Sequence, residues 1–233
     1  MNKEEISVHL RKAALGLLAL AGFSILSAVA AQAQQFSADI VTRHDDAPAP
    51  AGRLSVLDGR VRIETAALPD GFFLVDTLKP SAYFVRPVAR LYMDAKQSSQ
   101  LTRLFVPVDP DAPCRQWQAM ASVAGLSGQG EWRCERTGEE TIDGHGTVAF
   151  RALSGTSEGF VGWIDRERRF PLRIKTDDGT FITLERIKDE PQPASSFELT
   201  AGYGKFSPDA LIERIKQSDV WVARQGDAGP SRP

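Results

Sequence analysis

The stretch that decides the fold is GRLSVLDGRVRIETA, residues 52–66, in which apolar and polar residues alternate on both sides of a turn sequence. Placing Asp58 and Gly59 in a two-residue turn aligns the two halves as a β-hairpin, because Asp-Gly is a preferred pair for such turns. One face then carries Leu54, Val56, Val61 and Ile63. The other carries Ser55, Arg60, Arg62 and Glu64. The stretch therefore predicts an antiparallel sheet with one packed face and one wet face.

A second hairpin is predicted in PLRIKTDDGTFITL, residues 171–184. A two-residue turn at Asp178-Gly179 would set charged residues opposite apolar ones. A three-residue loop of Asp177, Asp178 and Gly179, with the glycine in the left-handed region, avoids this mismatch. It aligns Leu172, Ile174, Ile182 and Leu184 on one face.

The same alternation recurs along the chain in short runs bounded by glycine, proline and aspartate. Further strands are predicted at residues 36–43, 72–78, 82–86, 90–94, 131–141, 147–153, 160–165 and 196–199, and the second hairpin extends over 171–176 and 180–188. Residues 45–52, rich in Asp, Ala and Pro, are predicted to form a loop. The fold class is therefore mainly β (α+β), with about ten or eleven antiparallel strands in a sheet too long to stay flat.

Two helices accompany the strands. Cys114 to Ala124 has helical composition and ends at the glycine-rich residues 125–130. The second begins at Ser207, which caps a helix with Pro208 at its first position. Its apolar stripe consists of Leu211, Ile212 and Ile215. We expect two or three helices in total, one of them lying in the curl of the sheet.

The N-terminus has the pattern of a secretory signal peptide. Basic residues flank an apolar run, residues 13–30, and Ala31-Gln32-Ala33 follows as an A-x-A cleavage site. The alternative is an uncleaved membrane anchor, since the run approaches the roughly 18–20 residues that span a bilayer. We favour cleavage between Ala33 and Gln34, which gives a signal peptide at 1–33, one domain at 34–225, a disordered tail at 226–233 and a periplasmic product.

Export changes the meaning of the two cysteines. Cys114 and Cys134 show no C-x-x-C spacing, so in an oxidising compartment a disulfide is favoured over a metal or redox site. Two free buried thiols are the alternative. The formal net charge of -2 and the isoelectric point near 6.0 lack the basic footprint of nucleic-acid binding, so we expect no nucleic-acid partner.

The segment GEETIDGHGTVAF, residues 138–150, combines three acidic residues before His145 and invites a metal or acid/base interpretation. Its glycines lie between two alternating runs, so a hairpin turn is favoured. His44 lies in a separate segment, and two histidines are too few for a metal site, so none is expected. Ser157 in GTSEG fits G-x-S-x-G, but a strand rather than a helix follows it.

Aromatic residues that are able to stack on a ligand, or to pack in the sheet, are Trp117, Trp132, Trp163, Trp221, Phe72, Phe73, Tyr83, Phe84 and Tyr92. Packing in the sheet is the favoured role.

Three segments of the second half carry a family resemblance: GEETIDGHGTVAFRAL, GWIDRERRFPLRIKTDDGTFITLERI and PQPASSFELTAGYGKFS. With them the chain resembles exported bacterial proteins of the lipoprotein-carrier superfamily, related in fold to LolA and LolB. The resemblance implies an unclosed antiparallel barrel, strongly curved, with helices across its mouth and an apolar cavity between. The named carriers bind lipoprotein acyl chains. Thr200 departs from the family pattern, which commonly has Pro at that place.

We therefore expect a periplasmic, non-enzymatic carrier-like or binding protein for a hydrophobic ligand, a lipid or a lipoprotein acyl chain, without a cofactor. Its cavity would be lined by Leu54, Val56, Val61, Ile63, Leu172, Ile174, Ile182 and Leu184, although core packing also accounts for each of them. Two alternatives stay open. One is an envelope protein-interaction or sensor module with a filled core, and the other is a hydrolase that uses Ser157 or the histidines.

Overall fold

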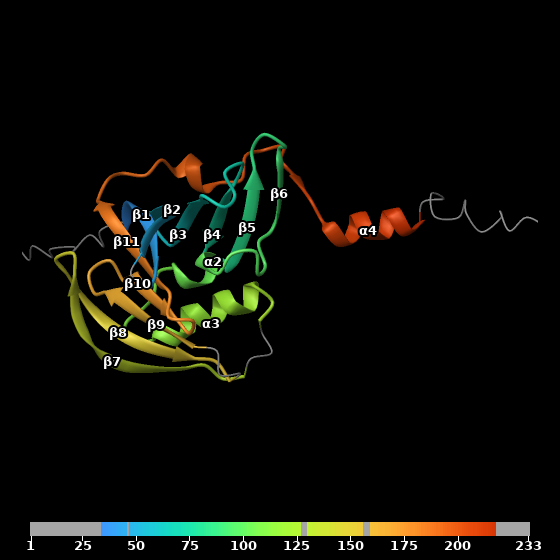
Figure 1. Cartoon of the computed structure of the whole chain (residues 1–233). Helices are drawn as coiled ribbons and strands as arrows, with labels where there is room; N and C mark the ends of the chain where they lie inside the picture. The colour runs from blue at the N-terminus through green and yellow to red at the C-terminus, as the bar shows by residue number, and fades with distance from the viewer. Residues whose placement is uncertain (1–33, 46, 127–129, 156–158, 218–233) are drawn as a thin grey trace, which may run out of the picture. The chain divides into compact units, whose positions relative to one another are not determined.

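The computed structural model describes residues 34–45, 47–126, 130–155 and 159–217, all within the second of two compact units, Ala33–Pro233 (Figure 1). The signal peptide predicted at 1–33 and the tail predicted at 226–233 lie outside the described residues. The described strands form one twelve-stranded sheet. Their bounds are β1 Gln35–His44, β2 Ala47–Leu57, β3 Arg60–Thr65, β4 Phe72–Asp76, β5 Ser81–Arg86, β6 Leu91–Asp94, β7 Arg133–Ile142, β8 His145–Leu153, β9 Gly159–Asp165, β10 Phe170–Thr176, β11 Phe181–Lys188 and β12 Gly204–Lys205.

The sheet is antiparallel throughout except at one edge. The strand order is β12-β6-β5-β4-β3-β2-β1-β11-β10-β9-β8-β7, and only the short pairing of β12 with β6 is parallel. The two edge strands, β12 and β7, do not pair with each other, so the sheet is an unclosed barrel. The predicted fold class is confirmed, with twelve strands rather than the expected ten or eleven.

Both predicted hairpins have the expected register. In the first, Leu54 lies opposite Ile63 and Val56 opposite Val61, and Asp58 and Gly59 form the turn with φ values of 46° and 84°. In the second, Ile174 lies opposite Ile182. There the amide of Thr176 donates to the carbonyl of Thr180 at 3.0 Å, which leaves a three-residue loop between them. Gly179 adopts φ 85° in that loop, a conformation that glycine reaches without steric cost.

The prediction of a loop at residues 45–52 is wrong. Residues from Ala47 onward belong to β2 and pair with β1, with Pro48 opposite Arg43 and Pro50 opposite Val41. The prolines are tolerated because β3 ends at Thr65, opposite Gly52, so this part of β2 is an edge. A proline there removes no hydrogen bond from the sheet interior.

The strand predicted at residues 196–199 is also wrong. A 3₁₀ helix, η1, spans Ala194–Phe197, and β12 follows at the sheet edge. Phe197 is buried, and Arg62 of β3 donates to the carbonyl of Ser196 at 3.3 Å. The segment is therefore held against β3, whose two strand neighbours already occupy its backbone groups. Residues 196–199 therefore find no free strand edge at β3 with which to pair, although their composition suits a strand.

Three α-helices occur in the described residues: α2 Leu101–Leu104, α3 Pro113–Val123 and α4 Pro208–Gln217. The predicted helix at 114–124 matches α3, and α2 was not predicted. In α4 the hydroxyl of Ser207 accepts the amide of Ala210 at 3.3 Å, as an N-cap does. Leu211 and Ile212 of α4 are exposed. No helix of the described residues is long and apolar enough to span a membrane.

Helices α2 and α3 lie in the curl of the sheet (Figure 1). We call the face that they cover the concave face. Trp117 of α3 is 1% exposed and sits over Gly162 of β9, where an added Cβ would lie 2.8 Å from the indole Cη2. The indole Nε1 donates to the carbonyl of Leu104 at 3.2 Å and so joins α3 to α2. One side chain thus fixes both helices on the sheet.

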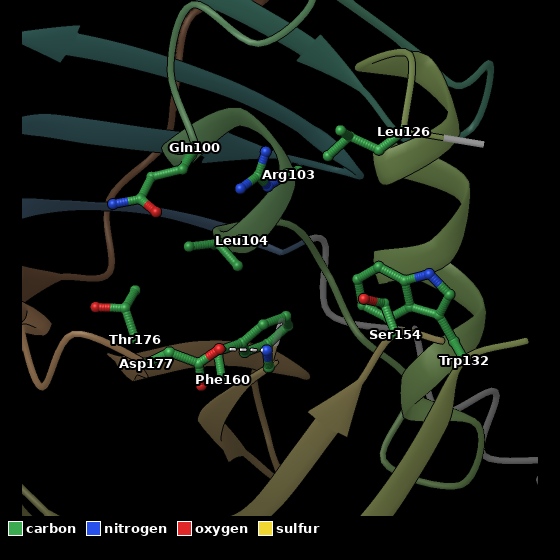
Figure 2. Close-up of a pocket in the computed structure, with 10 residues that line it drawn as sticks. Gln100, Arg103, Leu104, Leu126, Trp132, Ser154, Phe160, Thr176 and Asp177 are labelled. Carbon is green, nitrogen blue, oxygen red and sulfur yellow. Dashed lines mark hydrogen bonds between the residues drawn. The ribbon is translucent and has the colours of Figure 1, made fainter. Parts of the chain in front are cut away.

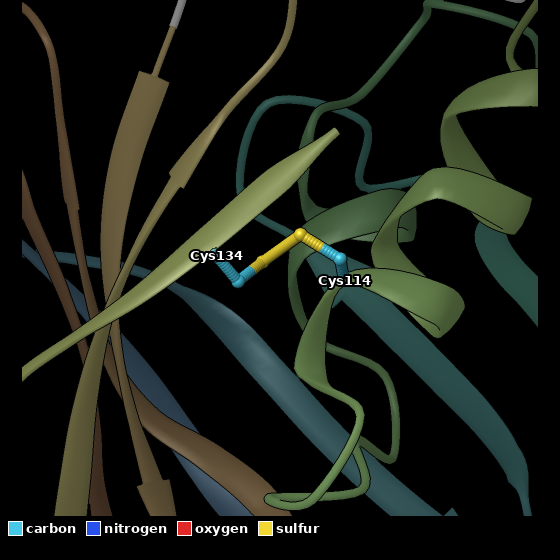
Figure 3. The surroundings of a disulfide bond; sticks show 2 residues. All are labelled: Cys114 and Cys134. Atoms are coloured by element: carbon cyan, nitrogen blue, oxygen red, sulfur yellow. A yellow bond between two sulfur atoms is a disulfide. The ribbon is translucent and has the colours of Figure 1, made fainter. Parts of the chain in front are cut away.

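The predicted disulfide is present. Cys114, at the start of α3, is bonded to Cys134, at the start of β7, with a Cα–Cα distance of 5.6 Å (Figure 3). Because β7 is the last strand at its edge of the sheet, the bond ties the first turn of α3 to that edge. Cys114 and Trp117 are three residues apart in α3, so the disulfide and the indole hold the helix at two points within one turn.

We predict that Gly162→Ala destabilises the protein by about 1–3 kcal/mol, because the new methyl group would push on the Trp117 ring. Gly146→Ala in β8 is the matched control, since an added Cβ there meets nothing within 4 Å. Urea denaturation measures both. Equal stability of the two variants would contradict the close packing of Trp117 on β9.

We also predict that replacing both Cys114 and Cys134 with serine lowers the free energy of unfolding by about 3 kcal/mol, since the bond closes a loop with a sequence separation of 20. Thermal and urea denaturation check this value. The wild type in reducing agent should behave like the double variant, and an unchanged stability would refute the prediction.

Candidate functional site

A cavity of about 240 Å³ opens between α2, the end of α3 and the ends of strands β8, β9 and β10 (Figure 2). We call it the mouth cavity. Its lining residues are Gln100, Arg103, Leu104, Leu126, Trp132, Ser154, Gly159, Phe160, Thr176 and Asp177. It is open to solvent at one side, which makes it a surface cleft rather than an enclosed void.

The cavity has an apolar wall. Phe160 projects from β9 on the concave face, with its ring centroid 4.8 Å from that of Trp117 and 6.2 Å from that of Trp132, both edge to face. Leu104 and Leu126 complete this wall from the helix side (Figure 2). Trp117 packs behind Phe160, is 1% exposed and does not itself line the cavity.

The opposite part of the lining is polar. Gln100 and Arg103 come from the α2 region, and Thr176 and Asp177 from the end of β10. The carboxylate Oδ2 of Asp177 accepts the amide of Gly159 at 2.5 Å, which joins the β10 end to the β9 start (Figure 2). An apolar wall with a polar rim suits an amphipathic molecule, whose chain and head require different surroundings.

Local sequence places these residues. Helix α3 ends in a Schellman motif, in which Leu126 donates its amide to the carbonyl of Ala121 at 2.9 Å and Gly125 donates to Ser122 at 3.0 Å. This turn sends Leu126 back toward the sheet. The disulfide at Cys134 positions the start of β7, two residues after Trp132. Two of the apolar wall residues thus come from the connection between α3 and β7.

The eight residues predicted to line a cavity lie elsewhere. Leu54, Val56, Val61, Ile63, Leu172, Ile174, Ile182 and Leu184 are each at most 2% exposed and belong to one core cluster with Trp117. None of them lines the mouth cavity. Of the residues that line the mouth cavity, the sequence analysis named only Trp132 as able to contact a ligand. Phe160 lay in a predicted strand, and the four-residue helix α2 is too short to have a periodic signal.

The histidine of the segment 138–150 belongs to a charged cluster rather than to a metal site. His145 is the first residue of β8, directly after a turn of Asp143 and Gly144. Its Nδ1 lies 2.9 Å from the guanidinium of Arg168 and 3.7 Å from Asp165 Oδ2. A guanidinium can only donate, so Nδ1 accepts and the proton of the neutral ring resides on Nε2. A general base of the serine-hydrolase kind needs the reverse arrangement.

Arg168 is the centre of this cluster. It binds Asp165 at 2.8 Å and Asp189 at 2.5 Å, and the side chain of Asp165 is 2% exposed. Burial lowers the pKa of the Arg168 guanidinium, but the hydrogen bonds and charges of Asp189 and Asp165 outweigh burial and raise the pKa above its usual value. The cluster links the end of β9 to the segment after β11.

The remaining catalytic candidates are not brought together. His44 lies next to Thr180, with 3.1 Å between Nδ1 and Oγ1, whereas His145 lies next to Arg168. Among the described residues no group of three or more His, Cys, Asp and Glu side chains is arranged to hold a metal ion. Ser157 lies outside the described residues.

No protein-family profile matches the sequence, and no curated protein sequence matches it. Several solved structures match this chain, among them the following three. An uncharacterized conserved protein from Thermus thermophilus aligns over 76% of this chain and 91% of its own, with 12% identity and a TM-score of 0.42. A chain of the Pseudomonas aeruginosa MucA/MucB complex aligns over 74% of this chain and 58% of its own, with 16% identity and a TM-score of 0.34.

The third is an outer membrane lipoprotein-sorting protein domain from Vibrio parahaemolyticus, described as putative, which aligns over 78% of this chain and 90% of its own. Its identity is 10% and its TM-score 0.29. With TM-scores below 0.5, none of the three likenesses establishes a shared function.

We predict that Asp165→Asn lowers the free energy of unfolding by about 3 kcal/mol, because it leaves the mostly buried charge of Arg168 without one of its two carboxylates. Asparagine keeps an oxygen for the amides of Glu167 and Arg168, so the change isolates the charge. Glu140→Gln, which breaks the more exposed pair with Arg173, should cost less than about 1 kcal/mol. Urea denaturation of both variants tests the difference, and similar losses would disprove it.

Proposed function

We propose that this protein is an exported, non-enzymatic binding protein that holds one acyl chain of a lipid or lipoprotein in the mouth cavity. The observation that carries the proposal is the composition of the cavity wall, with Trp132, Phe160 and Leu126 on one side and polar side chains at the opening. A chain lying against the two aromatic rings would bury apolar surface on both partners.

The size of the cavity limits the ligand. About 240 Å³ is less than the roughly 300–1,000 Å³ of pockets that enclose drug-sized molecules. We infer that the cavity accepts one chain end and that the rest of the ligand stays at the surface. Deeper entry would require Trp117 to leave Gly162 and to break its hydrogen bond to Leu104.

Export of the protein is part of the proposal. The signal-peptide pattern at residues 1–33 and the disulfide both fit an oxidising compartment, and the periplasm is the one we propose. No step of bond breaking is required. The Nδ1 of His145 is occupied by Arg168, which supports a binding role over a hydrolase.

One observation favours a second candidate, a module that binds another envelope protein. The concave face is packed with buried side chains at the eight predicted positions, as a filled core requires. In this case the mouth cavity would receive a side chain of a protein partner instead of a lipid.

Native mass spectrometry of the protein purified from the periplasm separates the two candidates. The proposal predicts a population heavier than the polypeptide by the mass of one lipid, which is lost on collisional activation. A lipid-free chain in complex with another protein would overturn the carrier role and support the module.

We predict that Leu126→Glu weakens binding of dodecyl maltoside, an uncharged single-chain probe, by at least about tenfold, because a carboxylate in the apolar wall is desolvated by the chain. Leu78→Glu makes the same change at a side chain that is 74% exposed and does not line the mouth cavity. Titration followed by tryptophan fluorescence or calorimetry measures both affinities. The control should bind like the wild type, and equal binding by the Leu126 variant would locate the chain elsewhere.

A further inference from the structure

A second cavity, of about 200 Å³, adjoins the mouth cavity at the same strand ends. The two cavities share Gly159, Phe160, Thr176 and Asp177. The second is further lined by Arg151, Leu153, Val161 and Lys175. We call this second cavity the headgroup cavity. The start of β9 and the end of β10 form a wall that separates it from the mouth cavity.

Two cations face the headgroup cavity from the two strands that flank β9. Arg151 of β8 and Lys175 of β10 both lie opposite Val161 of β9. Phe160 and Gly162 point to the concave face, so Val161 and its two neighbours point to the convex face. Their backbones are two strand spacings apart, about 10 Å. Side chains as long as those of arginine and lysine reach a common point between them.

Neither cation is neutralised within the described chain. Arg173, two residues before Lys175 on the same face, pairs with Glu140 at 2.9 Å, and Arg43 pairs with Glu185 at 2.5 Å. Arg151 and Lys175 take part in no ion pair among the described residues. Lys175 Nζ lies over the Phe181 ring, 5.2 Å from its centroid, a contact that leaves its charge without a counter-ion. Both side chains are exposed.

Two carboxylates are near these cations. Asp177 lines both cavities, but its Oδ2 is occupied by the amide of Gly159 at 2.5 Å. Glu135 of β7 lies opposite Arg151 in the register, is exposed and does not line the headgroup cavity. Among the described residues, an anion placed between Arg151 and Lys175 would thus meet two cations that form no ion pair, and the one carboxylate that lines the cavity, Asp177, is already hydrogen-bonded.

We propose that Arg151 and Lys175 bind the anionic head of an amphiphile, a phosphate or a carboxylate, while its acyl chain crosses the wall at Phe160 into the mouth cavity. This inference rests on the function proposed above and names the class of ligand: single chains with an anionic head. Charge-assisted hydrogen bonds supply the selectivity. Exposed cations hold a free anion weakly, so the chain is needed to keep the head in place.

The test compares three probes: dodecyl phosphate, dodecyl maltoside with the same chain and a neutral head, and inorganic phosphate. The wild type should bind dodecyl phosphate about tenfold or more tightly than dodecyl maltoside at low salt, and the preference should shrink as ionic strength rises. Inorganic phosphate at millimolar concentration should neither bind measurably nor displace dodecyl phosphate.

Arg151→Gln combined with Lys175→Gln should remove the preference for dodecyl phosphate and leave dodecyl maltoside binding unchanged. The matched control is Lys79→Gln combined with Arg90→Gln, which removes one lysine and one arginine that are exposed and line neither cavity. It should bind both amphiphiles like the wild type.

The outcomes separate the two proposals. If the first double variant keeps its preference for dodecyl phosphate, or if the control loses it equally, the headgroup assignment is wrong while the acyl cavity stands. Tight binding of inorganic phosphate alone would also overturn it, in favour of an anion site without a chain. If neither amphiphile binds the wild type, the proposed function itself fails.

Discussion

The packing of one indole ring on one glycine organises this protein. Trp117 rests on Gly162 because β9 has no side chain at that point, and its hydrogen bond to Leu104 brings α2 to the same place. A curved sheet leaves a volume on its concave side that must be filled or hydrated. Here two short helices fill it, and their position determines which part of the volume stays open.

The open part is the mouth cavity, and its character follows from what bounds it. Phe160 is the neighbour of Gly162 on the concave face, so the ring that packs on Trp117 also forms the cavity wall. The disulfide at Cys114 restrains α3 on the side of β7, and the Schellman turn at its other end directs Leu126 to the opening. Stability and the candidate site thus depend on the same helix.

The sequence predicted the regular parts of the fold well, since strand alternation and the Asp-Gly turns are local signals. Both hairpins, the disulfide and α3 were predicted correctly. The loop predicted at 45–52 and the strand predicted at 196–199 were wrong for a different reason. The free edge beside Thr65 and the lack of a free partner at β3 are properties of the assembled sheet, which no local pattern carries. The mouth cavity was missed for the same reason. Leu104, Leu126 and Phe160 meet only after α3 is seated on Gly162.

In the proposed mode of binding, Trp117 stays packed in the core and the ligand chain stops in front of it. A crystal structure with a dodecyl amphiphile that carries bromine at the end of its chain tests this most directly, because anomalous scattering locates the bromine. We expect a single peak beside Phe160 and Leu126, with Trp117 still on Gly162. A peak among the eight core residues with the indole displaced, or no peak inside the protein, would contradict the account.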